Sequence, residues 1–344
     1  MRRLHRTLVW IGVAYGLGLV AYAATRPRST PSTGLLELIN NFAPWWFVGV
    51  PLVILGGIGL RSPALAAAGL VAAGAFGLTW GDVFVRPPAS PPDGRPTVAV
   101  MTLNVLASNR QHGYLADTIA AESPDVVALQ ELEPDEAEDL VRVLGDRYPH
   151  RALRPVQKLG AGVLSRYPLR HVEDFQLSDG GNWGQRVEID APVGRFTLLN
   201  VHPAVPHLVR SESGGPLPIP RYDADRRNAE VRRLTRHIDA VDGPLLVTGD
   251  FNLTEYSADY HAMRARLGDA YRAAGRGLGL TFPRPWSFPH ALPAPWPVVR
   301  LDYVWYSGEL RPVEAHVGSS GGSDHRPVIV RFVRTETGAG EAGG

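Results

Sequence analysis

The chain has 344 residues, and its 35 basic and 34 acidic side chains give a formal net charge of +1. This balance leaves no overall electrostatic signature of a nucleic-acid-binding protein. The absence of cysteine excludes disulfide scaffolds, zinc–thiolate sites and thiol nucleophiles. Charged residues almost vanish between Leu8 and Trp80 and return to ordinary density after Arg95. We therefore expect a membrane module followed by one enzyme-sized domain.

Three apolar runs, Leu8–Ala24, Phe42–Leu60 and Ala64–Trp80, fill most of the first eighty residues. A spanning helix needs about 20 mostly apolar residues, so each run is long enough. We predict a membrane module over residues 1–83 with three transmembrane helices, whose partner is the lipid bilayer. The first run also fits a cleaved signal peptide, with its charged start and small residues at the end. A buried globular hairpin is disfavoured because the runs have no polar face.

The arginines near these runs indicate an orientation. Three arginines precede the first run and Arg61 separates the second from the third, which favours a cytoplasmic N-terminus. Arg26 and Arg28, between the first two runs, oppose this bias. Three crossings from a cytoplasmic N-terminus predict a multi-pass protein of the cell membrane with its C-terminal domain outside the cytoplasm.

The rest of the chain divides by composition. Residues 84–96 are rich in proline and predict a semi-rigid linker. Residues 97–334 form the candidate catalytic domain. Residues 335–344 are rich in glycine and predict a disordered tail.

The candidate catalytic domain alternates short apolar runs with amphipathic stretches. Apolar or alternating runs bounded by turn residues predict strands. The expected strands are Thr97–Leu103, Asp125–Gln130, Gly162–Leu164, Arg186–Asp190, Arg195–Val201, Pro244–Thr248, Leu301–Tyr306 and Pro327–Phe332. The expected helices are Tyr114–Ala121, Asp135–Leu144, Asp223–Ile238 and Tyr256–Leu267.

Polar residues gather at the ends of these strands. They are Asn104, Glu131, His202, Asp250, Asn252, Asp302, Asp324 and His325. Carboxylates, amides and imidazoles at several strand ends can converge in one cleft, which is the usual form of a catalytic or metal site. Taken singly, each has an ordinary interpretation, such as a solvated strand end or an Asx-turn.

Two short motifs carry most of the chemistry. In GDFN the carboxylate of Asp250 and the amide of Asn252 can both bond an attacking water; an Asx-turn explains the tetrapeptide equally well. In SDHRPV, Asp324 can ligate a hard cation while His325 donates a hydrogen bond to a phosphoryl oxygen. Magnesium binds through only one or two protein carboxylates, so Glu131 together with Asp324 would suffice.

Together the motifs resemble the endonuclease/exonuclease/phosphatase superfamily. TLNV, PDVVALQE, NVH, GDFN, LDYV and SDHRPV occur in family order between Thr97 and Arg334. The resemblance implies a four-layer α/β/β/α sandwich in which two mixed sheets pack face to face. It also implies hydrolysis of phosphodiester or phosphomonoester bonds by in-line attack of water, with Mg²⁺ or Mn²⁺ as cofactor.

The resemblance assigns roles to these residues. Glu131 corresponds to the principal metal ligand, Asn104 to the amide that supports it, and Asp324 to a second carboxylate on the metal side. Asp250 and Asn252 correspond to the pair that orients and deprotonates the water.

The resemblance also assigns the groups that meet the phosphate. His325 corresponds to the imidazole at the scissile phosphate, with Asp302 as its partner, and His202 to an acid or phosphate ligand. In GGNWGQR, Asn182 and Arg186 are candidate phosphate contacts.

Several alternatives stay open. The fold could serve a non-enzymatic membrane receptor, although none of the expected catalytic groups is missing. GSSGG formally matches a nucleophile elbow with Ser320, but that motif must lead from a strand into a helix, and here a strand follows. The substrate could be a nucleic acid or a phospholipid headgroup, with the Trp-containing loop Phe282–Val298 beside the site. No obligate protein partner is evident. Because every candidate lies within Arg95–Arg334, we expect that fragment to fold and act alone.

Overall fold

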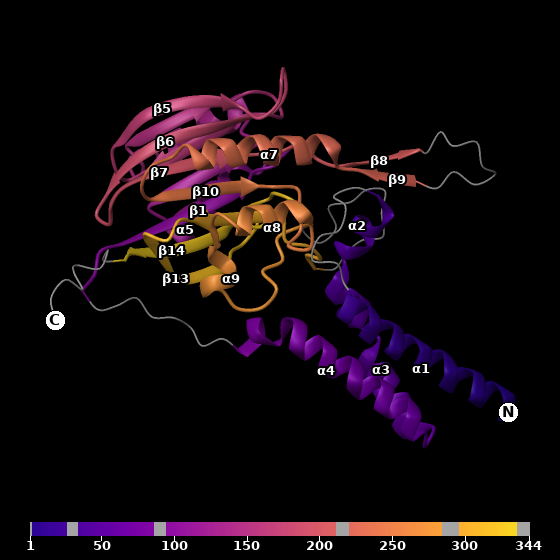
Figure 1. Ribbon diagram of the computed structural model, residues 1–344. Helices are drawn as coiled ribbons and strands as arrows, with labels where there is room; N and C mark the ends of the chain where they lie inside the picture. Colours follow the sequence, from indigo (N-terminus) through magenta and orange to yellow (C-terminus); the bar gives the residue numbers. More distant parts are fainter. Residues whose placement is uncertain (1, 26–33, 86–93, 211–219, 284–295, 336–344) are drawn as a thin grey trace, which may run out of the picture.

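The computed structural model describes residues 2–25, 34–85, 94–210, 220–283 and 296–335. Most of the predicted linker and tail therefore lies outside the described residues, as do Trp286 and Phe288 of the Trp-containing loop. The two parts of the chain expected from composition are both present: an N-terminal group of helices and a C-terminal domain of two sheets (Figure 1).

Five helical segments make up the N-terminal part. They are α1 (Arg2–Thr25), α2 (Leu35–Asn40), the 3₁₀ helix η1 (Ala43–Phe47), α3 (Val50–Gly59) and α4 (Pro63–Val85). Among the described residues, α1 and α4 are long and apolar enough to cross a membrane. The same length and composition occur in core helices and, near an N-terminus, in signal sequences. In the apolar 18-residue window of each helix, only 11% of α1 and 28% of α4 is buried, which is unlike a core helix.

The expectation of three long spanning helices is wrong for the second apolar run. That run forms η1 and then the ten-residue α3, with Pro44 and Pro51 in their first turns. Each proline lacks a backbone donor and begins a new helical segment instead of continuing the previous one. At 1.5 Å per residue, α3 alone is about 15 Å long, roughly half the hydrocarbon thickness of a bilayer.

Glycines allow the N-terminal helices to approach closely. A Cβ at Gly12 or Gly16 of α1 would collide with Leu65 or Ala68 of α4, so these two helices run in the same direction. A Cβ at Gly57 of α3 would meet the backbone of α4 near its start, so α3 runs the opposite way. The chain therefore passes along the bundle three times, and its N-terminus lies at the end away from the C-terminal domain (Figure 1).

The C-terminal domain contains two mixed sheets of six strands each. The first has the order β13-β14-β1-β2-β4-β3 and the second the order β11-β12-β10-β7-β6-β5. The first sheet consists of β1 (Thr97–Asn104), β2 (Val126–Gln130), β3 (His150–Arg154), β4 (Ala161–Ser165), β13 (Leu310–Val317) and β14 (Val328–Arg334). The second consists of β5 (Leu169–Gln176), β6 (Trp183–Ala191), β7 (Gly194–Val201), β10 (Leu245–Asp250), β11 (Gly268–Asp269) and β12 (Asp302–Tyr306). A separate hairpin pairs β8 (His207–Arg210) with β9 (Pro220–Asp223).

Helices cover the outer face of each sheet. Apolar residues of α5 (His112–Glu122) and α6 (Pro134–Leu144) pack on β1 and β2. Those of α7 (Asp225–Asp239) and α8 (Ala258–Arg264) pack on β7, β10 and β12. A third cluster, which includes Val100, Leu198 and Val304, lies between the sheets. The expected arrangement of two mixed sheets face to face, with helices outside, is confirmed. The short α9 (Ala270–Ala274) contacts β12, β13 and β14.

Strand direction brings the polar ends together. β1 and β2 are parallel, and so are β7 and β10, so their carboxyl ends lie at one edge of each sheet. β14 is antiparallel to β1 and β12 is antiparallel to β10, so these two strands begin at that same edge. Asp250, the last residue of β10, is directly opposite Asp302, the first residue of β12.

Candidate active site

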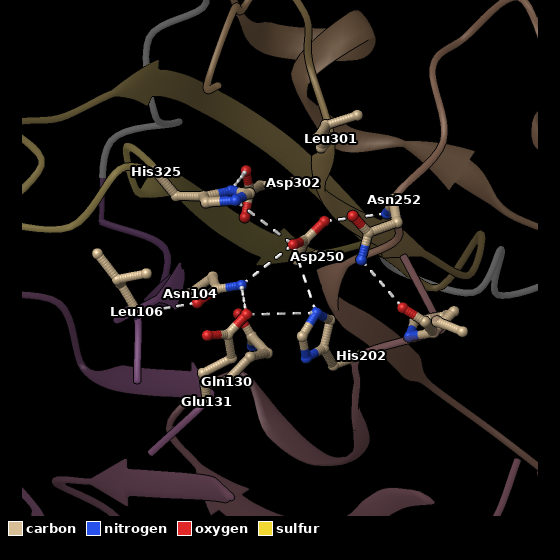
Figure 2. A network of polar contacts seen from close by, with 12 residues as sticks. Asn104, Leu106, Gln130, Glu131, His202, Asp250, Asn252, Leu301, Asp302 and His325 are labelled. Carbon is tan, nitrogen blue, oxygen red and sulfur yellow. Dashed lines mark hydrogen bonds and ion pairs between the residues drawn. The ribbon is translucent and has the colours of Figure 1, made fainter. Parts of the chain in front are cut away.

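The site lies where the inner faces of both sheets reach this edge (Figure 2). Side chains alternate along a strand, so residues two apart share a face. Val100 and Leu198 belong to the core between the sheets. By this alternation Asn104 on β1 and His202 just after β7 point into the same space as those core residues. Leu246 is a core residue too, and Asp250 shares its face.

Asp250 is the centre of the site. Its side chain is 2% exposed. The Oδ2 atom accepts a hydrogen bond from Asn104 Nδ2 at 3.1 Å and lies 3.6 Å from His202 Nε2 and 3.5 Å from His325 Nε2. Its other oxygen accepts from the backbone N–H of Asn252 at 2.9 Å. Figure 2 shows these groups arranged around the carboxylate. Three side chains from separate segments, and one backbone N–H of the following turn, therefore meet at one buried acid.

Glu131 is held beside Asp250 by a turn after β2. Its φ of 60° is in the left-handed region, an unusual conformation for a residue with a side chain. The carboxylate accepts hydrogen bonds from Asn104 Nδ2 at 2.9 Å and from the backbone N–H of Ala107 at 3.1 Å. His202 Nε2 lies 3.8 Å from the same carboxylate. Asn104 thus joins Glu131 to Asp250 through its amide.

The end of β10 and the turn that follows it also contain unusual backbone conformations. Gly249 has a φ of 151°, and a Cβ there would lie 1.9 Å from the carbonyl oxygen of Val201, so only glycine fits. Asn252 has a φ of 51°. Its side-chain amide donates to the carbonyl oxygen of Pro203 at 3.0 Å. The amide therefore fixes the loop after β7, which carries His202, to the loop after β10.

His325 and Asp302 form a buried pair. His325 Nδ1 lies 2.8 Å from Asp302 Oδ2, and both side chains are buried, with exposed fractions of 6% and 0%. Burial alone lowers the pKa of this imidazole, but the charges of Asp302 and Asp250 outweigh it and raise the pKa to about 10. The imidazole is therefore a cation at neutral pH. The ring of Phe282 packs on it at a centroid distance of 4.6 Å.

Asp324, next to His325, is in surroundings rich in negative charge. Burial raises the pKa of its carboxyl, and although the charge of His325 lowers it, the charges of Glu131 and Asp250 raise it further. Carboxylates grouped in this way repel one another unless a cation compensates them.

One group of three ionisable side chains among the described residues, Asp250, Asp302 and His325, offers ligand atoms within 4.8 Å of one another and could hold a metal ion. A protonated imidazole has no lone pair for a metal, so the His325 cation itself fits an ion-pair role better than a ligand role. Glu131, Asp324 and Asn104 supply the oxygen atoms that magnesium prefers. Their positions beside the same carboxylate are consistent with that chemistry.

The remaining predicted residues divide into two groups. His202 Nε2 is buried and has no hydrogen-bond partner among the described residues, although it faces Glu131 and Asp250. Asn182 donates to the carbonyl oxygen of His202 at 2.7 Å, so it supports this histidine. Arg186 on β6 does not reach the site. Its neighbour Val187 points into the core between the sheets, so Arg186 lies on the outer face of the sheet. There it pairs with Glu173 on the adjacent strand β5.

A cavity of about 630 Å³ opens beside Glu131 and His202. Arg110, Lys158 and Arg226 lie on its lining. Sequence reasoning did not place these three cations at the site, because each belongs to a loop or helix start whose approach to the site depends on the tertiary fold. Arg226 donates to Asn182 Oδ1 at 3.3 Å, which shows how closely this rim adjoins the site.

Ser320 lies in the loop between β13 and β14, so a strand both precedes and follows it. A nucleophile elbow requires a helix after the serine. The serine-hydrolase alternative therefore has no structural support.

The comparisons with known proteins agree with this geometry. The model of the endonuclease/exonuclease/phosphatase family matches residues 101–325. The chain belongs to this family, whose members are metal-dependent phosphoesterases.

Its relatives are distant. It is 27% identical over 234 residues to the uncharacterized protein YbhP of Escherichia coli K12, covering 60% of this chain and 83% of YbhP. The fold is similar to an endonuclease/exonuclease/phosphatase structure from Beutenbergia cavernae, with 22% identity, a TM-score of 0.52 and coverage of 70% and 72% of the two chains. It is also similar to truncated TDP2 of Caenorhabditis elegans, with 17% identity, a TM-score of 0.52 and coverage of 69% and 98%.

Proposed function

We propose that the protein is a membrane-tethered phosphoesterase that requires a divalent metal and hydrolyses a phosphodiester or phosphomonoester bond by in-line attack of water. The observation that carries this proposal is the convergence of Asn104, His202 and His325 on the buried carboxylate of Asp250. A scaffold protein that only binds has no need for such a costly group of buried charges.

The metal would be held by Glu131 and Asp324, with Asn104 fixing the orientation of Glu131. Mg²⁺ or Mn²⁺ suits these oxygen donors. The pKa of Asp324 is raised by burial and further by the charges of Glu131 and Asp250, and a bound cation would offset both effects. When bound, such an ion supplies Lewis-acid stabilisation of charge on the phosphoryl oxygens.

The chain's own residues account for the other steps. Asp250 can accept the proton of the attacking water, and Asn252 holds the carboxylate in place through its backbone N–H. The His325 cation can donate a hydrogen bond from Nε2 to a non-bridging phosphoryl oxygen, where negative charge grows in the transition state. Asp302 keeps that imidazole charged and oriented. His202, whose Nε2 has no partner among the described residues, is placed to ligate the phosphate or protonate the leaving group.

The tether consists of the N-terminal helices. α1 and α4 are the two candidate spans, and the run of η1 and α3 returns the chain between them. Because α1 and α4 run in the same direction, the chain would enter α1 on one side of the membrane and leave α4 on the other. This supports opposite sides for the N-terminus and the catalytic domain.

The substrate is an anion with an accessible phosphoester, from a nucleic acid or a phospholipid headgroup. Arg110, Lys158 and Arg226 on the cavity support this charge preference. Trp296, expected beside the site, instead stacks on Trp45 of η1 at 6.3 Å and is therefore engaged with the N-terminal helices.

The test is hydrolysis by the full chain in detergent micelles, with Mg²⁺ or Mn²⁺, of single-stranded DNA, RNA, phospholipid vesicles and bis(p-nitrophenyl) phosphate. We expect Glu131→Gln, Asp250→Asn and His325→Ala each to lower turnover by at least about 10²-fold. Chelation by EDTA should abolish turnover, and added Mg²⁺ or Mn²⁺ should restore it. Ser320→Ala is the matched control and should keep the wild-type rate. Binding of these substrates without turnover would favour a receptor instead.

A further inference from the structure

The turn that carries Asn252 is contacted by the N-terminal helices as well as by its own domain. Helix α2, between the two candidate spans, contributes Glu37, which is 1% exposed. Glu37 Oε1 accepts from Arg227 Nη2 of α7 at 2.6 Å, and Arg227 is also 1% exposed. Arg227 Nη1 donates in turn to the backbone carbonyl oxygen of Asn252 at 2.9 Å. A continuous line of contacts therefore connects α2 to the residue beside Asp250.

A second contact reaches the same turn. Thr254 Oγ1 donates to Asn41 Oδ1, just after α2, at 2.7 Å. The backbone N–H of Gly34, just before α2, donates to the carbonyl oxygen of Tyr222 at 2.8 Å. Helix α2 is thus attached to the catalytic domain at both ends and through Glu37 in its middle.

The conformation of Asn252 explains why these contacts matter. A non-glycine residue with φ near 51° lies in the left-handed region, which most side chains disfavour, and it persists only where its surroundings hold it. Its backbone N–H bonds Asp250, its side chain bonds Pro203, and its carbonyl oxygen bonds Arg227. Without the Glu37 carboxylate, the buried guanidinium of Arg227 loses its nearest counter-charge. The next acid is Asp259, whose Oδ2 lies 3.9 Å away.

We propose that α2 is a positioning element of the active site: Glu37 holds Arg227, and Arg227 holds Asn252 in the conformation that aims Asp250. α2 lies outside the stretch that matches the family, residues 101–325, so the catalytic domain uses a residue from the N-terminal helices to complete its own catalytic turn. This inference rests on the proposed function for its kinetic readout but not for its structural one. It also runs against the expectation that the fragment Arg95–Arg334 is fully active alone.

The experiment compares the full-length protein with Glu37→Gln in detergent micelles. In the variant we expect kcat for bis(p-nitrophenyl) phosphate with Mn²⁺ to be about 10-fold or more below the wild-type value. KM should stay within about 2-fold of wild type, because the cations on the cavity lining are unchanged. Backbone amides of residues 251–254 should exchange with deuterium about 10-fold faster or more.

Two further variants separate positioning from stability. In Glu37→Gln/Arg227→Met the unpaired guanidinium is removed while Asp259 stays buried, so thermal stability should recover in part relative to Glu37→Gln. The kcat should nevertheless stay low, because the carbonyl oxygen of Asn252 still lacks its donor. Tyr148→Phe removes a buried hydrogen bond to Pro124 in the loop before β2, at the opposite end of that strand from Glu131, and should lower stability without changing kcat.

Wild-type kcat and wild-type exchange of residues 251–254 in Glu37→Gln would overturn the proposal, as would full recovery of kcat in the double variant. If the wild-type protein hydrolyses no phosphoester at all, the proposed function fails. The exchange measurement still decides the role of α2 in that case.

Discussion

Replacing Asp302 by asparagine tests the electrostatic core of the site. The two side chains have the same shape, so the variant keeps the volume but loses the charge that faces His325 at 2.8 Å. In the wild type this charge and that of Asp250 hold the pKa of His325 at about 10. Without Asp302, the lowering of the pKa by burial is opposed mainly by the charge of Asp250, so the pKa of His325 should fall back toward, or below, the ordinary value of 6.5.

The size of the effect follows from the protonated fraction. At pH 7.5 a group with a pKa near 10 is almost fully protonated, whereas one with a pKa near 6.5 is only about 10% protonated. If the cation stabilises the phosphoryl oxygens, kcat/KM of Asp302→Asn at pH 7.5 should fall by about 10-fold or more. It should recover as the pH falls toward 5.5, whereas His325→Ala should show no recovery.

The assay is the pH profile of kcat/KM between pH 5.5 and 9 with bis(p-nitrophenyl) phosphate, together with Mn²⁺ affinity from electron paramagnetic resonance. In our interpretation Asp302 is a partner of the imidazole, so Mn²⁺ affinity should stay within about 2-fold of wild type. A marked loss of Mn²⁺ affinity would instead identify Asp302 as a ligand. A variant whose pH profile has the same shape and height as the wild type would refute the role given to the pair.

Two other predictions concern stability and sidedness. Burial, reinforced by the charge of Asp135, raises the pKa of Glu136 to about 8 from a usual 4.5, so the folded state binds a proton that the unfolded state releases. The stability contribution is therefore complete below pH 4.5 and is lost as the pH rises to about 8, by up to about 1.4 kcal/mol per pH unit. Melting curves of Glu136→Gln at pH 5, 7 and 9 should show a growing advantage over wild type, and equal differences at all three would contradict this account. For sidedness, alkaline phosphatase fused after Pro88 should be active, and protease added to cells stripped of any outer layer should digest the catalytic domain. Protection until the membrane is permeabilised would mean that the bundle is inverted or that one pass does not cross.

The sequence predicted the strands that carry the site better than those that do not. All eight expected strands and all four expected helices form, with bounds that differ by a few residues. Strand β5 was missed because its side chains are mostly exposed, so it lacks the apolar alternation of a core strand. Strand β13 was missed because polar residues and a proline interrupt its apolar pattern.

What the sequence by itself determined was the chemical content of the site and the layered fold, since strand periodicity and strand-end polar residues are local features. The tertiary structure alone decided that Asp250 is the hub, because its contact with Asn104 joins residues 146 apart. It also decided that Arg186 faces outward, that the second apolar run is broken, and that Glu37 meets Arg227 across 190 residues. Such contacts depend on which faces pack together, and no local pattern records that choice.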